Sequence, residues 1–173
     1  NKYNAVRLDF GAIGDSDTET DNRYTRAAKT LDEWLKEEIL IQDPEPAVYC
    51  LREEYVTLQE KAAVRDAVIA AVRLTDFSEG RIVPHEETSA RPKKDRMELM
   101  EATEANLSPI FCLYPDPERA VGDLLQKTRE GEPDLMLTDE RDTRHSLWKV
   151  SDPQAASSLC ELISRSEILI ADG

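Results

Sequence analysis

Residues 152–173 read DPQAASSLCELISRSEILIADG, and this stretch decides the class of fold. It opens with Asp152-Pro153, a helix N-cap followed by proline at the first helical position. Apolar residues then recur at helical spacing, at Ala156, Leu159, Cys160 and Ile163. The run Ile168–Ala171 is continuously apolar, as in a buried strand, and it enters Asp172-Gly173. A helix followed by such a strand predicts a mixed α/β domain whose ligand loops lie at the carboxyl end of the strand.

The same alternation of helix and strand continues upstream through the second half of the chain. We predict a helix over 93–105 with Met97 and Met100 facing inward, and then a short buried strand over 109–114. Asp116-Pro117 repeats the cap-and-proline start of a further helix. Two apolar runs on either side of a charged turn are typical of a β-hairpin. The predicted hairpin strands are Asp134–Thr138 and Ser146–Val150.

The first half begins with the run Asn4–Phe10, whose apolar residues indicate a strand. A helix is predicted from Tyr24 to Ile39 by its spacing of apolar residues, with Asp21 or Asn22 as the N-cap. Three strands are then expected, at Ala47–Leu51, Tyr55–Leu58 and Ala67–Leu74. The last of these is rich in alanine, which also suits a helix, but the neighbouring turns favour a strand.

These elements predict a mixed α/β (α+β) fold, with several short strands in a mixed sheet packed by four or five helices. The 173 residues are enough for a single α/β region over 1–173, with 1–83 and 84–173 as candidate sub-lobes. A chain of this size buries enough surface to fold without a metal or a disulfide. We expect it to be a fragment of a larger protein.

The balance of charge restricts the partners of the chain. It carries 36 acidic and 22 basic residues, a formal net charge of −14. Such a field repels nucleic-acid backbones and anionic lipids, so neither nucleic acid nor membrane is an expected partner. A local basic cluster can still reverse the sign of the potential inside a cleft. The expected partner is therefore a small anionic or nucleotide ligand.

The cysteines indicate a reducing compartment. Cys50, Cys112 and Cys160 are an odd set without a close pair, and each lies in an apolar stretch. We predict three buried, reduced thiols and a cytoplasmic location.

The densest polar constellation lies between Pro84 and Arg96, at the expected start of the helix over 93–105. A helix start offers free backbone N–H groups and the positive end of the helix dipole, which together favour an anion. Lys93 adds positive charge, and Arg96 can hold a phosphate through two hydrogen bonds. His85 is a candidate general acid or base because histidine changes its charge near neutral pH. The segment is a candidate site for a phosphate-bearing ligand.

Two other interpretations of this segment stay open. The first is a solvated charged loop in which Asp95 and Arg96 pair with each other. The second is a metal site through His85 and Glu86. The sequence holds two histidines far apart, with neither paired cysteines nor a His-Glu-x-x-His motif, so we expect no metal held by protein ligands alone. A magnesium ion that arrives with a nucleotide needs only a carboxylate or two, which Glu86 or Asp172 can supply.

Several stretches resemble one bacterial and archaeal family, an uncharacterised domain of unknown function. The stretches extend over nearly the whole chain, in the order and spacing of that family, except that Lys2 stands where its members often have proline. They are Asn1–Asn4, Val6–Leu8, Leu31-x-x-Trp34, Ala70–Leu74, Pro84-His85-Glu86-x-Thr88, Lys93-x-Asp95-Arg96, Asn106–Tyr114, His145–Val150 and Ile168–Gly173.

In that family the Ala-Asp-Gly sequence continues into a His-His-Arg stretch that opens a helix. This element is similar to the phosphate-binding signature of the ParB and sulfiredoxin superfamily, which includes nucleotide binders and phosphoryl-transfer enzymes. The resemblance implies that Asp172 and Gly173 begin the signature loop. It also implies that an insertion faces this loop and contains His85, Glu86, Lys93, Asp95 and Arg96. A resemblance at the level of the fold specifies no substrate.

Two functions follow as hypotheses. In the first, the full protein is a phosphotransferase-like enzyme that binds a nucleotide or phosphorylated small molecule at the end of the Ile168–Asp172 strand. Its catalytic candidates are His85, Glu86 and Asp172, and its ligand-binding candidates are Lys93, Asp95, Arg96 and Gly173. In the second, the same pocket binds a ligand without chemistry, as a sensor or an assembly module. Turnover of a nucleoside triphosphate with magnesium distinguishes the two.

Overall fold

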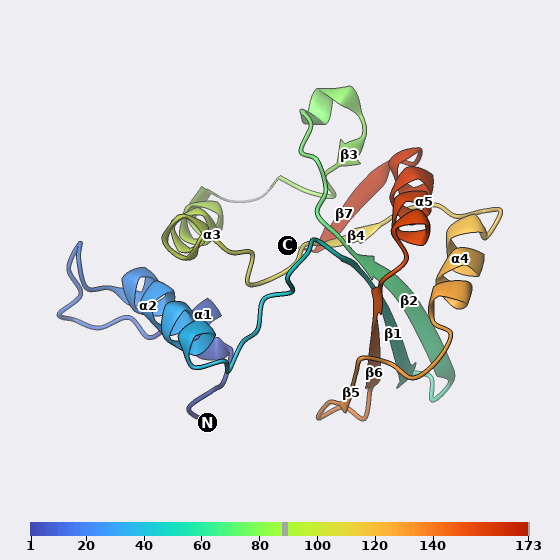
Figure 1. The fold of residues 1–173 in the computed structure, drawn as a ribbon. Coiled ribbons are helices and arrows are strands. Elements are labelled where there is room, and N and C mark those ends of the chain that lie inside the picture. Colours follow the sequence, from blue (N-terminus) through green and yellow to red (C-terminus); the bar gives the residue numbers. More distant parts are fainter. Residues whose placement is uncertain (88–89, 173) are drawn as a thin grey trace. The chain divides into compact units, whose positions relative to one another are not determined.

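The computed structural model describes residues 1–87 and 90–172, and it confirms a mixed α/β fold (Figure 1). The chain forms two compact units. Unit 1 consists of Asn1–Pro44, Pro84–Phe111 and the end of the chain from Ile170. Unit 2 consists of Glu45–Val83 and Cys112–Leu169. The chain passes from unit 2 to unit 1 between Val83 and Pro84. The division into sub-lobes 1–83 and 84–173 stays a prediction.

The helices of unit 1 are α1 (Val6–Asp9), α2 (Arg23–Lys36) and α3 (Ala90–Thr103). The sequence fixes the start of α2 through Asn22, as expected. The Asn22 side chain accepts hydrogen bonds from the backbone N–H groups of Tyr24, at 3.0 Å, and Thr25, at 3.1 Å. The Thr25 hydroxyl in turn accepts from the Asn22 N–H at 3.0 Å, which completes a capping box.

Two predictions for unit 1 are wrong. The expected strand Asn4–Phe10 is instead the short helix α1, because the Asn4 side chain accepts from the Val6 N–H and starts a turn. On α3 the buried positions are Leu99 and Thr103, whereas Met97 and Met100 face solvent. The residues Asp95, Leu99 and Thr103 follow one another at intervals of four. They therefore lie on one face of α3, and the polar side chain of Asp95 shares the inward face with Leu99 and Thr103.

A four-stranded antiparallel sheet forms the centre of unit 2, in the order β2-β1-β6-β5. Its strands are β1 (Val48–Val56), β2 (Ala62–Ile69), β5 (Leu135–Thr138) and β6 (Arg144–Val150). The predicted hairpin is confirmed as the pair β5 and β6. The two strands expected at 47–51 and 55–58 are one continuous strand, and the strand expected at 67–74 begins earlier, at Ala62.

Charged residues caused the error at β1. They interrupt its apolar pattern at Arg52 and Glu53, but in the sheet each meets an opposite charge on β2. The Arg65 Nε donates to a Glu53 carboxylate oxygen at 2.5 Å, and Arg52 pairs with Asp66 at 3.4 Å. Cross-strand pairs of this kind stabilise a sheet, and they keep these residues inside the strand.

Helices α4 (Ala120–Thr128) and α5 (Pro153–Ser164) lie beside this sheet (Figure 1), and the core of unit 2 lies between them and one face of the sheet. The core residues come from both layers: Val48, Cys50, Val121, Leu125, Val150 and Leu159. The α5 helix begins as predicted, with the Asp152 carboxylate accepting from the N–H groups of Gln154 and Ala155.

The α4 helix begins later than predicted. The Asp116 carboxylate still caps the N-terminus of α4, although a turn separates it from the helix. It accepts hydrogen bonds from the backbone N–H groups of Val121 at 3.3 Å and Gly122 at 2.9 Å. Arg119 closes that turn in the left-handed region, at a φ of 58°. The cap-and-proline pair therefore marks the approach to the helix and not its first residue.

A second, three-stranded sheet has the order β3-β7-β4. Its strands are β3 (Ile82–Val83), β4 (Phe111–Leu113) and β7 (Ile168–Asp172), and a short 3-10 helix (Phe77–Glu79) precedes it. Ile82 and Val83 pair in parallel with Ile168 and Leu169. The predicted strand at 168–171 is confirmed, but Leu169 is exposed, and so are Phe111 and Leu113 of the strand that was expected to be buried.

The cysteines are all free but differ in burial. Cys50 is buried in the core of unit 2, Cys112 is half-buried and Cys160 is exposed. The predicted burial of Cys160 is wrong because its neighbour Leu159, with no exposed surface, occupies the inward position on α5.

Candidate functional site

The predicted site begins in the segment before α3. His85 and Glu86 lie side by side, with 3.6 Å between the His85 Nε2 and a Glu86 carboxylate oxygen. Both side chains reach solvent, and so does Lys93 in the first turns of α3. Thr88 of the motif lies outside the described residues. The structure therefore brings His85 and Glu86 together on an accessible surface.

Arg96 has a different environment, because its guanidinium is already occupied by carboxylates. It contacts one Asp9 carboxylate oxygen at 2.5 Å and the Asp9 carbonyl oxygen at 3.1 Å. It also donates to the Asp95 carboxylate at 2.7 Å, and it lies over the Phe10 ring at 5.0 Å. The local pair expected between Asp95 and Arg96 is present, but on the helix α3 and partly buried rather than in a solvated loop, and Asp9 joins it.

Further partners extend this cluster across unit 1. The Tyr24 hydroxyl donates to Asp95 at 2.7 Å, and Arg23 forms an ion pair with the same carboxylate. The Ser108 hydroxyl donates to the second carboxylate oxygen of Asp9 at 2.6 Å. We call this set the Arg96 network; its members are Asp9, Arg23, Tyr24, Asp95, Arg96 and Ser108.

The Arg96 network balances its own charge, since two guanidinium groups face two carboxylates. Its acidic members are mostly shielded from water: the side chain of Asp9 is 16% exposed and that of Asp95 is 23% exposed. Hydrogen bonds between charged groups are strong in such partly desolvated places. The network therefore holds α1, α2 and the segment at Ser108 against α3.

The sequence did not reveal this network because its members are far apart along the chain. Asp9 and Arg96 are separated by 87 positions, and Asp9 lay in a segment predicted to be a strand. The one local signal was the pair Asp95-Arg96 itself.

At the other end of the predicted site, Asp172 is exposed at the end of β7, and Gly173 lies outside the described residues. The convergence of Asp172 with the start of α3 stays a prediction.

A second polar cluster surrounds His145 on the sheet of unit 2. Its Nδ1 lies 3.3 Å from a Glu53 carboxylate oxygen, and its Nε2 donates to Asp139 at 3.1 Å. Glu53 is only 8% exposed, and it also accepts from Arg65. The hydrogen bond from His145, aided by the backbone N–H of Thr143, holds the pKa of Asp139 below its usual value. Both ring nitrogens of His145 therefore face carboxylates, one from β1 and one from the turn between β5 and β6.

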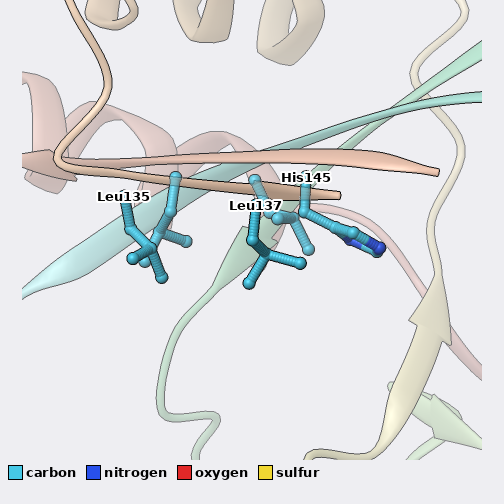
Figure 2. Close-up of a pocket in the computed structure, with 5 residues that line it drawn as sticks. Leu135, Leu137 and His145 are labelled. Carbon is cyan, nitrogen blue, oxygen red and sulfur yellow. The ribbon is translucent and has the colours of Figure 1, made fainter. Parts of the chain in front are cut away.

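Beside His145, an apolar hollow of about 320 Å³ lies on the face of the sheet opposite to Cys50. Its walls are Leu51, Leu135, Leu137, His145 and Leu147. Figure 2 shows the side chains of Leu135, Leu137 and His145 projecting from the same side of the strands. The hollow was missed because its leucines come from three strands, although the alternation of Leu135 and Leu137 was visible in the sequence.

Residues 1–87 and 90–172 contain no group of three His, Cys, Asp or Glu side chains placed to hold a metal ion. None of the helices in these residues combines the length and the apolar character that a bilayer span requires.

Fold and site together define a two-unit α/β protein in which the basic start of a helix is anchored through an internal ion-pair network. The chain belongs to the family described as "Protein of unknown function (DUF1015)", whose family model matches residues 1–173. No curated protein matches the chain, and no solved structure does.

Proposed function

We propose that the protein binds a small anionic ligand, a nucleotide or another phosphorylated small molecule, at the amino end of α3. The observation that carries this proposal is a local reversal of charge. Residues 91–96 contain four basic side chains and one acidic one, in a chain whose net charge is −14. Lys93 and Arg91 are exposed, so their charge is available to a ligand, whereas the exposed Lys94 lies 3.6 Å from a Glu98 carboxylate oxygen. The positive end of the helix dipole adds to this field.

Within this proposal the residues divide into two groups. Lys93 neutralises the charge of a phosphate directly, and His85 exchanges a proton with the bound molecule. The Arg96 guanidinium is balanced by Asp9 and Asp95, so Arg96 and Asp95 orient the first turns of α3. Glu86 or Asp172 would orient a hydroxyl group or hold a magnesium ion that enters with the nucleotide, and Gly173 would let the chain approach the phosphate closely.

If phosphoryl transfer takes place here, its catalysis is mainly positioning and neutralisation of charge. A magnesium ion bound by the phosphates would reduce their negative charge.

The test measures binding of ATP, ADP and pyrophosphate to the full protein by calorimetry, with and without magnesium. We expect Lys93→Glu to weaken binding by roughly tenfold or more, because it replaces a favourable charge by a repulsive one. Lys29→Glu is the matched control, since Lys29 is an exposed lysine of α2 in the same unit. Equal affinities for the two variants and the unmodified protein would contradict the proposal.

Transfer is tested separately, by following radiolabelled phosphate from a nucleoside triphosphate to small hydroxyl compounds. We expect His85→Asn to abolish transfer while it leaves nucleotide binding largely intact. Binding without transfer for the unmodified protein would support the second candidate function, a ligand-responsive assembly module. The apolar hollow on the sheet of unit 2 favours that candidate, because such a surface suits contact with another protein.

A further inference from the structure

The β5 strand is an edge of the four-stranded sheet. It pairs with β6 on one side, and no strand of the described residues pairs with its other side. All four of its residues are exposed, including Leu135 at 53%, Met136 at 52% and Leu137 at 47%. An exposed apolar edge strand is a template on which another extended chain can pair.

The chain on both sides of β5 is strongly acidic, although Arg144 of β6 contacts the Met136 sulfur on the strand itself. Residues 130–142 contain six acidic side chains and one basic side chain. The acidic residues stand on both sides of the strand, at Glu130, Glu132, Asp134, Asp139, Glu140 and Asp142. An apolar strand with negative charge at both ends selects its partner by charge as well as by shape.

This charge argues against a second copy of the chain as the partner. If two β5 strands paired antiparallel over their full length, Asp134 of one copy would lie opposite Asp139 of the other. Like charges directly opposite each other destabilise a strand pair. The net charge of −14 adds a further repulsion between copies.

Besides the flanking charges, the apolar hollow beside β5 is a second feature that a partner strand can recognise. Leu135 and Leu137 line it, and it continues onto Leu147 and Leu51 of the neighbouring strands. A strand added at β5 would direct every second side chain to this face, because side chains alternate along a strand. Its apolar side chains would then extend the wall of the hollow.

We propose that the free edge of β5 binds an extended segment of another protein, apolar at alternate positions and basic at both ends. The segment adds a fifth strand to the sheet, its apolar residues join Leu135 and Leu137, and its basic ends face the acidic residues that flank β5. This inference is independent of the anion site on α3.

Two synthetic peptides test the proposal on the full chain. Both have a centre of alternating valine and threonine; one has two lysines at each end, and the other has two glutamates there. We expect the lysine-ended peptide to bind at least roughly tenfold more tightly, and more weakly as salt is added. Hydrogen exchange of the backbone N–H groups should slow at residues 135–138 when this peptide is bound.

A pair of substitutions tests the role of the charges. Glu132→Gln combined with Glu140→Gln should weaken binding of the lysine-ended peptide roughly fivefold. The control pair is Glu118→Gln with Glu167→Gln, which removes two exposed charges elsewhere in unit 2 and should leave the affinity unchanged.

Several outcomes would overturn the proposal. Equal affinity for the two peptides would remove the role of charge, and protection outside β5 would place the peptide elsewhere. If neither peptide binds, the proposal that β5 binds an extended segment is wrong. A protein that sediments as a dimer, with residues 135–138 protected before any peptide is added, would assign the edge to a second copy.

Discussion

Arg96 is the residue on which the arrangement of unit 1 depends, since its guanidinium contacts both Asp9 and Asp95. The Arg96 guanidinium forms ion pairs with these carboxylates, and it also makes a cation–π contact with the Phe10 ring. Loss of the guanidinium would leave the partly buried Asp9 carboxylate without its counter-charge, whereas Asp95 would keep Arg23, and such an unbalanced charge costs more than the pair contributes.

We therefore predict that Arg96→Gln lowers the free energy of unfolding by about 1–2 kcal/mol, a value reduced because the Arg96 side chain is 34% exposed. Urea denaturation measures this change. Lys94→Gln on the same helix is the control and should stay within about 0.5 kcal/mol of the unmodified protein.

A double-mutant cycle with Asp9→Asn then isolates the pair. We expect a coupling free energy of about 1 kcal/mol between positions 9 and 96. Strictly additive effects would contradict this prediction, because they would show that the pair contributes no coupling free energy.

Asp139 predicts a dependence of stability on acid pH. Its pKa in the folded protein is lowered, first by the hydrogen bond from His145, relative to an ordinary value of 3.8. The stabilisation is therefore complete above that ordinary value and is lost as the pH falls through the lower folded-state pKa. At neutral pH Asp139→Asn should be less stable than the unmodified protein, and the difference should shrink as the pH falls below about 4.

Thermal unfolding between pH 7 and pH 2 measures this effect. Asp15→Asn is the control, since Asp15 is an exposed aspartate outside the His145 cluster. A difference for Asp139→Asn that is independent of pH would contradict the assignment of His145 as its partner.

At the scale of the elements, the start of α2 depends on the capping box of Asn22 and Thr25. Asn22→Ala removes the acceptor of two backbone N–H groups, and we predict a loss of about 1 kcal/mol. Asn22→Asp should keep most of the stability, because a carboxylate accepts the same bonds and interacts favourably with the helix dipole. Circular dichroism during urea denaturation compares the two variants.

Elements with a complete local signal were the ones that the sequence predicted correctly. Asp152-Pro153 specified the start of α5, and the hairpin of β5 and β6 followed from two apolar runs around a charged turn. The strand β1 was divided in two because its central charges are balanced only by β2. Local sequence does not show a partner that the fold supplies.

The same limit applies to the candidate site. The sequence placed His85, Glu86 and Lys93 near a helix start, and that start is α3. It assigned Arg96 to a ligand, whereas the structure gives it Asp9, a partner 87 positions away. Ion pairs between distant segments depend on tertiary packing, which neither periodicity nor capping motifs encode.

At the scale of the whole molecule, each unit contains one of the two tryptophans. Trp34 is buried on α2 in unit 1, and Trp148 packs against the core of unit 2. Each fluorescence signal can thus be followed alone after the other tryptophan is replaced by phenylalanine. The two units can then be observed separately during unfolding.

We predict that Leu159→Ala lowers the stability reported by Trp148 by about 2–5 kcal/mol, because it opens a cavity in the core of unit 2. The signal of Trp34 should change less. Equal shifts of the urea midpoint in both signals would show that the two units unfold as one cooperative body. Leu58→Ala is the control, because Leu58 is fully exposed and its truncation should have little effect on either signal.

The discontinuous make-up of unit 1 has a consequence for its synthesis. Its helix α2 packs on α3, but residues 45–83, which belong to unit 2, are translated between them. On the ribosome, α2 with its buried residues Ala27 and Trp34 therefore emerges long before the helix α3 on which it packs. During this interval the apolar face of α2 is exposed on the growing chain. We therefore expect chaperone binding to peak before α3 leaves the exit tunnel and to decline afterwards.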